Sequence, residues 1–236
     1  MPGPIALVGS GEFLPALEPV DRILLDAVGG RGSRVVILPT ASAPDGETVF
    51  ARWGRMGRDH FEELGAAVEV LAVRVREDAS HAAFVEAVQA ADFVYLSGGK
   101  PDHLYEVLVD TPLVAALRAM WERGGAIAGC SAGAMVLAGQ RLSFGGRVPM
   151  PSRWRDGLGF VPGAAVAPHY DRWPEAMMAP MVLLAPAGTV VLGIDEETAL
   201  VGRGGAWQVH GPGRVTVWRG KDRTRHTNGD SVRLEA

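Results

Sequence analysis

The segment Gly129-Cys130-Ser131-Ala132-Gly133 carries the strongest chemical signal in the sequence. It follows a short run of small apolar residues, which predicts a buried strand, and it precedes an apolar stretch that predicts the start of a helix. A serine between two glycines on such a turn projects its hydroxyl out of the sheet, at the positive end of the new helix. The pattern therefore predicts Ser131 as a nucleophile, with the Ala132 N–H free to bind an oxyanion.

A serine hydroxyl needs a base within hydrogen-bond reach and a third group that orients that base. Six histidines are available. His169 is the best placed, because it follows a short strand-like run and a proline that cannot extend a helix; a structural role for it remains open on the pattern alone. Candidates for the orienting acid are Asp195, Glu196 and Glu197, which directly follow an apolar strand. The pattern does not choose among them.

Two glycine-containing loops also follow predicted strands. In Ser97-Gly98-Gly99-Lys100-Pro101 the paired glycines allow backbone N–H groups to converge, so this loop is a candidate for the second oxyanion donor. An ordinary strand-to-helix turn is an equal alternative. The earlier loop, Gly9-Ser10-Gly11-Glu12, lacks the third glycine of a dinucleotide-binding fingerprint, and it is either a tight turn or a loop that lines the site.

The elements that must position these residues predict an α/β fold. Apolar strands alternate with amphipathic helices, which indicates a mostly parallel, doubly wound sheet with helices on both faces and a site at the carboxyl ends of its strands. After Ala199 the turn-rich chain predicts an antiparallel β meander. We expect one domain over residues 1–236. The strands are predicted at Ile5–Val8, Val35–Leu38, Val68–Val73, Asp92–Leu96, directly before the Ser131 turn, and at Val190–Ile194.

The region Ser143 to Gly163 is rich in Gly, Pro and Arg and shows little periodicity, so it is interpreted as an insertion or a lid over the site. Arg147, Arg153 and Arg155 lie in it, and an arginine there could hold a substrate carboxylate at two points. Solvated arginines on a surface loop are an equal alternative.

The overall composition excludes some functions. The net charge is −4 with scattered basic residues, so neither nucleic acid nor an anionic membrane is an expected partner. The start of the chain lacks the pattern of a signal peptide and no apolar run is long enough to span a membrane, which predicts a cytoplasmic location. Cys130 is the one cysteine, so no internal disulfide and no cysteine-based metal cluster can form. No metal and no cofactor is expected.

Taken together, the paired glycines, the Gly-Cys-Ser-Ala-Gly-Ala turn, the Pro-His-Tyr segment and the stretch Leu192 to Ala199 resemble the serine peptidases that include peptidase E (aspartyl dipeptidase) and cyanophycinase. Their fold is similar to that of class I glutamine amidotransferases. The resemblance covers nearly the whole chain. It implies Ser131 as nucleophile, His169 as base, Glu196 as orienting acid with Asp195 as runner-up, and the backbone of Gly99 and Ala132 as oxyanion hole.

The resemblance also implies a small peptide as substrate and leaves a homodimer possible. Gly98, Lys100, Tyr170 and Arg153 are the expected substrate-binding residues. The chain departs from cyanophycinase where Ala167-Pro168 replaces an acidic residue and a glutamine, and where Lys100-Pro101-Asp102 replaces the glutamine after the paired glycines. The groups that would bind an aspartyl substrate are therefore not evident. Two other readings stay open: an amidotransferase-like enzyme that uses Cys130, and an inactive binding protein of the same fold.

Overall fold

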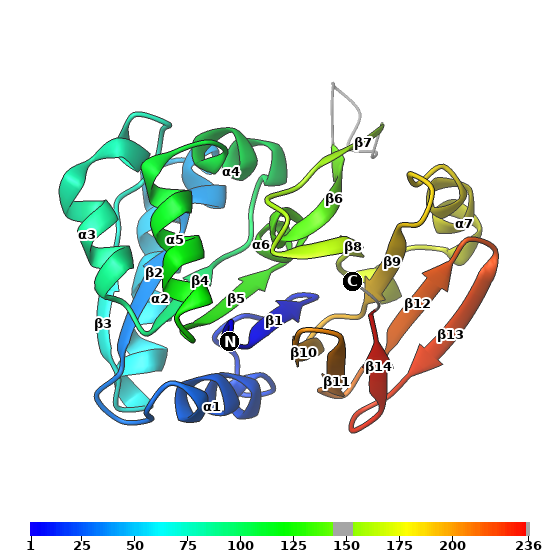
Figure 1. The fold of residues 1–236 in the computed structure, drawn as a ribbon, viewed down its shortest axis with the longest axis horizontal. Coiled ribbons are helices and arrows are strands. Elements are labelled where there is room, and N and C mark those ends of the chain that lie inside the picture. Colours follow the sequence, from blue (N-terminus) through cyan, green and yellow to red (C-terminus); the bar gives the residue numbers. More distant parts are fainter. Residues whose placement is uncertain (144–152, 235–236) are drawn as a thin grey trace.

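A computed structural model describes residues 1–143 and 153–234 of the chain. They form two β-sheets, seven α-helices and three short 3-10 helices (Figure 1). The α-helices are α1 (Glu18–Ala27), α2 (Glu47–Glu63), α3 (Ala82–Ala90), α4 (Pro101–Leu108), α5 (Pro112–Glu122), α6 (Ala132–Leu137) and α7 (Glu175–Leu183). The 3-10 helices are η1 (Thr40–Asp45), η2 (Asp78–Ser80) and η3 (Tyr170–Arg172).

The first sheet contains the parallel strands that the sequence predicts up to the Ser131 turn, whereas the strand predicted at Val190–Ile194 lies in the second sheet. Its order is β14-β11-β10-β1-β5-β4-β2-β3, and β1, β5, β4, β2 and β3 run parallel while the other three are antiparallel. The strands are β1 (Ile5–Val8), β2 (Arg34–Leu38), β3 (Ala67–Val70), β4 (Phe93–Leu96), β5 (Ala126–Cys130), β10 (Ala199–Arg203), β11 (Ala206–His210) and β14 (Ser231–Arg233).

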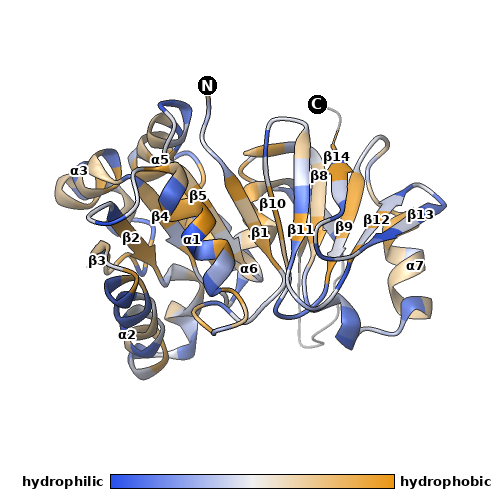
Figure 2. Cartoon of the chain, turned by 90° about the horizontal axis from the view of Figure 1, so that it is seen from below, coloured by the Kyte–Doolittle hydropathy of each residue, from blue (hydrophilic) through white to orange (hydrophobic). Residues whose placement is uncertain are grey.

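Helices cover both faces of this sheet, as the continuous apolar strands predict. Figure 2 shows α3 and α5 on one side of β2 and β4, and α2 on the other, with hydrophobic residues concentrated in the strands. Leu117 and Met120 of α5 join the core on one face, and Leu24 of α1 and Phe61 of α2 join the core on the other. The chain has the predicted α/β fold, with a mostly parallel, doubly wound sheet.

The second sheet has the order β13-β12-β9-β8-β6-β7. Its strands are β6 (Ala138–Ser143), β7 (Arg153–Asp156), β8 (Val161–Ala167), β9 (Val190–Ile194), β12 (Val215–Arg219) and β13 (Asp222–His226). The C-terminal strands are antiparallel, as predicted, but they divide between the sheets: β10 and β11 pair in the first, whereas β12 pairs with β9 in the second. Val166 and Ile194 of the second sheet belong to the same buried cluster as Leu117 and Met120 of α5, so the two sheets share a core on that face.

The region expected as an insertion or lid is partly regular structure. Arg153–Asp156 forms the edge strand β7, which pairs antiparallel with β6, and β8 begins at Val161. Arg153 and Arg155 are exposed on β7, and Arg147 lies outside the described residues. A polar edge strand needs no alternation of apolar residues, which explains why the sequence pattern missed it.

The local signals at α5 show how the sequence sets helix boundaries. Thr111 Oγ1 accepts the Val114 N–H at 3.4 Å and Pro112 occupies the first turn. Gly124, two residues after the last helical residue, has φ +110°. The chain then enters β5, which leads to Ser131. Among the helices of the described residues, none combines the length and the apolar character needed to cross a membrane.

Candidate active site

Ser131 lies alone on the turn between β5 and α6. Its backbone has φ +50° and ψ −107°, a conformation that non-glycine residues rarely adopt and that is typical of a strained nucleophile turn. The flanking glycines are required by close contacts: a Cβ on Gly129 would lie 2.5 Å from the Gly133 carbonyl carbon, and one on Gly133 would lie 2.2 Å from Leu96 O. The two glycines therefore let β5, α6 and β4 pack tightly enough to expose the Ser131 hydroxyl.

His169 reaches Ser131 from the second sheet. It follows β8 and Pro168, and its own backbone is left-handed, with φ +51° and ψ +38°. The ring nitrogen Nε2 lies 2.9 Å from Ser131 Oγ, within hydrogen-bond distance. A neutral imidazole with its proton on Nδ1 would accept the serine proton at Nε2. The imidazole is thus placed to act as a base toward Ser131.

Glu196, the residue two positions after β9, contacts the other ring nitrogen of this imidazole. Its Oε1 lies 2.9 Å from His169 Nδ1, so the carboxylate can accept the Nδ1 proton and fix the tautomer. The Glu196 backbone N–H donates to Asp171 Oδ1 at 2.9 Å, which anchors the segment beside η3. The structure thus brings Ser131, His169 and Glu196 into one chain of contacts.

The two neighbouring acids lie elsewhere. Asp195 is buried and its Oδ2 accepts the Arg214 N–H at 2.9 Å. Burial raises the pKa of the Asp195 carboxyl. Glu197 has φ +53°, and its backbone N–H donates to Ser10 O at 3.2 Å. Asp195 and Glu197 therefore hold backbone segments together, and Glu196 alone of the three contacts the His169 ring.

The two candidate oxyanion donors flank the nucleophile. Gly99 has φ +143°, and a Cβ there would lie 2.3 Å from Ala41 O, so only glycine fits between this loop and η1. Within the described residues, the N–H groups of Gly99 and Ala132 donate no hydrogen bond. Both groups therefore remain available to a negatively charged oxygen formed beside Ser131.

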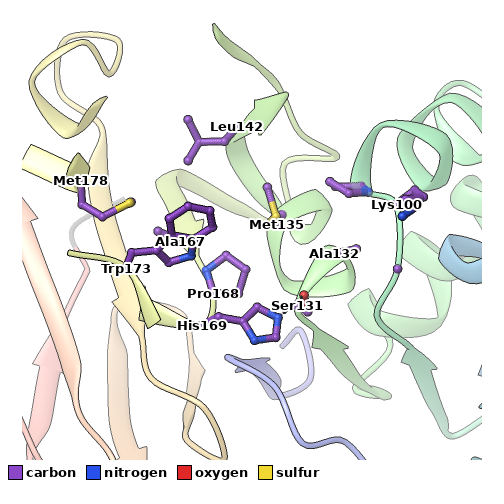
Figure 3. Close-up of a pocket in the computed structure, with 12 residues that line it drawn as sticks. Lys100, Ser131, Ala132, Met135, Leu142, Ala167, Pro168, His169, Trp173 and Met178 are labelled. Atoms are coloured by element: carbon purple, nitrogen blue, oxygen red, sulfur yellow. Dashed lines mark hydrogen bonds between the residues drawn. The ribbon is translucent and has the colours of Figure 1, made fainter. Parts of the chain in front are cut away.

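A pocket of about 270 Å³ opens beside Ser131, and its walls are mostly apolar. Figure 3 shows Trp173 and Met178 on one side of the pocket, Met135 and Lys100 on the other, and Leu142 above. Lys100 stands at the rim and pairs with Asp45 at 3.3 Å, where both side chains are solvent-exposed. A second pocket meets the first at Ser131 and His169, and Glu12, Arg52 and Trp53 are among its lining residues. Substrate can thus extend to both sides of the nucleophile.

Of the other residues expected to bind substrate, Gly98 lines a pocket, whereas Tyr170 and Arg153 line neither. Gly98 lines the second pocket, but its N–H already donates to Glu12 Oε1 at 2.8 Å. Tyr170 is buried away from both pockets: its hydroxyl accepts the Trp218 Nε1–H at 2.9 Å, and its ring packs against Gly193. Arg153 is exposed on the edge strand β7 and lines neither pocket.

Cys130, one residue before the nucleophile, is fully buried. Its Sγ donates to Glu12 Oε2 at 2.8 Å. Burial and the adjacent Glu12 carboxyl raise the pKa of the Cys130 thiol well above its usual range, so it stays protonated. The geometry does not present this sulfur to either pocket beside Ser131.

Sequence reasoning missed Glu12 and the apolar wall residues Trp173 and Met178. The sequence marks the loop that carries Glu12 as a turn or a site-lining loop, but no pattern indicates that its carboxyl is buried against two other segments. Within the described residues, there is no group of three or more His, Cys, Asp or Glu side chains that could hold a metal ion.

Proteins of known family resemble this chain in sequence. Residues 5–210 match peptidase family S51. The chain is 31% identical over 236 residues to cyanophycinase of Nostoc sp. (strain PCC 7120 / SAG 25.82 / UTEX 2576), covering 97% of this chain and 77% of that protein. It is 30% identical over 223 residues to cyanophycinase of Synechococcus elongatus, covering 91% of this chain and 67% of that protein.

Two solved structures are similar in fold. The crystal structure of a peptidase from an acI-B1 Actinobacterium has a TM-score of 0.89 and 35% identity, covering 99% of this chain and 98% of that one. A putative peptidase E protein from Listeria monocytogenes EGD-e has a TM-score of 0.63 and 18% identity, covering 96% and 99%, and supports the fold alone. With a Ser-His-Glu arrangement on this fold and a family match over most of its length, the chain belongs to peptidase family S51, a family of serine peptidases.

Proposed function

We propose that this protein hydrolyses an amide bond in a small peptide, with Ser131 forming an acyl-enzyme. The observation that carries the proposal is the pair of 2.9 Å contacts that connects Ser131 Oγ through the His169 imidazole to Glu196 Oε1. A serine hydroxyl at neutral pH attacks a carbonyl only when a positioned base removes its proton, and this arrangement supplies one.

The reaction runs in two stages. As Ser131 Oγ attacks the amide carbon, His169 Nε2 takes the hydroxyl proton, and Glu196 stabilises the imidazolium that forms. The carbonyl oxygen becomes negatively charged and accepts hydrogen bonds from Gly99 and Ala132. His169 then donates its proton to the leaving amine, whose bond to the acyl carbon breaks. A water then attacks the ester as His169 takes its proton, the bond between the acyl carbon and Ser131 Oγ breaks, and His169 returns the proton to Oγ, which releases the acid and restores Ser131.

The apolar walls of the pocket beside Ser131 favour substrates that carry an uncharged, apolar residue next to the cleaved bond. Met135, Leu142, Trp173 and Met178 line it, and a buried apolar side chain gains roughly 25 cal/mol per Å² removed from water. An acidic side chain would lose its hydration there, and the one lysine or arginine among the described lining residues is Lys100, which is already paired with Asp45.

A panel of short peptides tests this proposal. We expect kcat/KM for peptides with Leu, Met or Phe beside the cleaved bond to exceed that for Asp or Glu by about tenfold or more. If the protein hydrolyses none of the peptides in the panel, the proposed function is contradicted. A strong preference for acidic peptides that is lost in Arg153→Ala or Arg155→Ala would contradict the apolar pocket and favour an arginine clamp.

Two adjacent methionines of α7 provide a matched pair of variants. Met178 is buried and lines the pocket, whereas Met177 is 40% exposed and does not. Met178→Ala should lower kcat/KM for apolar peptides several-fold, because it removes part of the pocket wall, and Met177→Ala should leave it unchanged. Equal effects of both substitutions would show that the pocket wall does not select the substrate.

A further inference from the structure

Glu12 is a buried carboxyl at a junction of three segments. It lies in the loop after β1 and is 4% exposed. Oε1 accepts the Gly98 N–H at 2.8 Å, and Oε2 accepts the Cys130 S–H at 2.8 Å. Both oxygens of one rigid, planar group therefore accept a hydrogen bond, Oε1 from the loop after β4 and Oε2 from the end of β5.

The two partners of Glu12 directly precede the groups that the proposed reaction needs. Gly98 precedes Gly99, the oxyanion donor on the loop after β4. Cys130 precedes Ser131, which leads to the second donor at Ala132. The segments are in close contact, since a Cβ on Gly98 would lie 2.9 Å from Glu12 Oε1 and 3.4 Å from Ser131 Cβ.

The loop that carries Glu12 is itself anchored to the other parts of the site. The Ser131 N–H donates to Val8 O at 2.9 Å, at the end of β1. The Gly9 N–H donates to Thr198 O at 2.9 Å, and Ser10 O accepts the Glu197 N–H at 3.2 Å, directly after Glu196. The loop therefore connects the nucleophile, the paired glycines and the segment of the orienting acid.

A buried carboxyl is a poor choice if stability alone is required. Among the described residues, no cation pairs with Glu12, whose hydrogen-bond partners are one backbone N–H and one thiol. Burying such a group costs free energy that an apolar residue of similar volume would not cost. A role in holding two segments at a fixed separation would explain why the chain buries a carboxyl here.

We propose that Glu12 is a positioning residue that sets the distance between the two oxyanion donors, Gly99 N–H and Ala132 N–H, by joining Gly98 to Cys130 through its two oxygens. The inference rests on the proposed function. It assigns to Glu12 no contact with the reacting atoms. Its effect is exerted through the backbone, where a shift of about 1 Å in a catalytic group can cost about 100-fold in rate.

The test compares Glu12→Gln with two control variants. In Gln the amide oxygen can still accept the Gly98 N–H, but the NH₂ group cannot accept the Cys130 S–H and can only donate to the sulfur, a weak acceptor, at a longer distance that separates the two segments. We expect kcat to fall about 10- to 100-fold, with KM changed less than about threefold. The affinity for a peptide aldehyde, whose serine adduct carries an oxyanion, should fall by a similar factor, while the melting temperature stays within a few degrees.

Asp21→Asn is the control for loss of a buried carboxylate, because Asp21 is 1% exposed and bonds His60 Nε2 at 2.8 Å away from both pockets. It should change stability and leave kcat and aldehyde affinity unchanged. Cys130→Ala removes the same bond to Oε2 but adds no group that separates the two segments, so its kcat should fall, though less than that of Glu12→Gln.

The proposal is wrong if Glu12→Gln leaves kcat and aldehyde affinity within about twofold of wild type. It is also wrong if activity in Glu12→Gln falls only in proportion to the folded fraction. Wild-type turnover in the same assay separates the two claims: an inactive wild type refutes the proposed function, whereas an active wild type with an insensitive Glu12→Gln refutes only the role of Glu12.

Discussion

Ser131→Ala is expected to lower kcat by at least about 10⁴-fold, because no other hydroxyl stands within hydrogen-bond distance of His169 Nε2 among the described residues. The variant should keep its fold, since alanine adds no atom to the turn. Hydrolysis of the best peptide from the panel, with the melting temperature measured in parallel, checks both points.

Cys130→Ala is the matched comparison at the adjacent position. The Cys130 thiol is fully buried, has a raised pKa and bonds Glu12, so we expect this variant to lose less activity than Glu12→Gln and to stay far more active than Ser131→Ala. Inactivation of the wild type by iodoacetamide, together with retained activity in Ser131→Ala, would instead show that the cysteine is the nucleophile.

Glu196→Gln is expected to lower kcat by about 10²- to 10⁴-fold with little change in KM. A neutral amide cannot stabilise the imidazolium that forms during attack, and its NH₂ group can donate to His169 Nδ1 and favour the wrong tautomer. Measurement of kcat and KM on one peptide across a range of pH tests this role.

Asp195→Asn provides the control for Glu196→Gln. Asp195 accepts the Arg214 N–H at 2.9 Å and does not contact His169, and an asparagine oxygen can keep that bond. Its kcat should stay within about tenfold of wild type. If Asp195→Asn is the more damaging substitution, Glu196 is not the orienting acid.

Local patterns predicted much of the fold. The apolar strands and amphipathic helices of the first sheet follow from hydrophobic periodicity, and the Thr111-Pro112 pair marks the start of α5. The division into two sheets could not be predicted. Whether β12 pairs with β11 or with β9 depends on long-range packing, because strands of similar composition carry no local signal for their neighbour.

The site could be predicted only in part, because only some of its residues lie in local sequence patterns. The glycine spacing around Ser131 marks the turn, and the proline before His169 marks the end of a strand. In contrast, the orientation of Tyr170 into the core and the burial of Glu12 depend on residues distant in sequence: Trp218 for Tyr170, and both Gly98 and Cys130 for Glu12. The left-handed backbone of His169 likewise has no sequence signature, because β-region and left-handed conformations are both open to histidine.

The apolar pocket was not predicted, because its walls come from four separate parts of the chain. Met135 lies on α6, Leu142 on β6, and Met178 on α7, while Trp173 follows η3. The sequence instead makes arginines of the 143–162 region candidates for substrate binding, with solvated surface arginines as an equal alternative, since basic residues in a loop are visible in the sequence and a composite apolar wall is not.

Mapping of a fluorophosphonate adduct on the wild-type protein is the most direct test of the central claim. The probe reacts with a serine only where a base activates the hydroxyl and an oxyanion hole accepts the phosphoryl oxygen. We predict one adduct, on the peptide that contains Ser131, and its loss in Ser131→Ala. A folded, unlabelled wild type, or an adduct on another residue, would contradict the account.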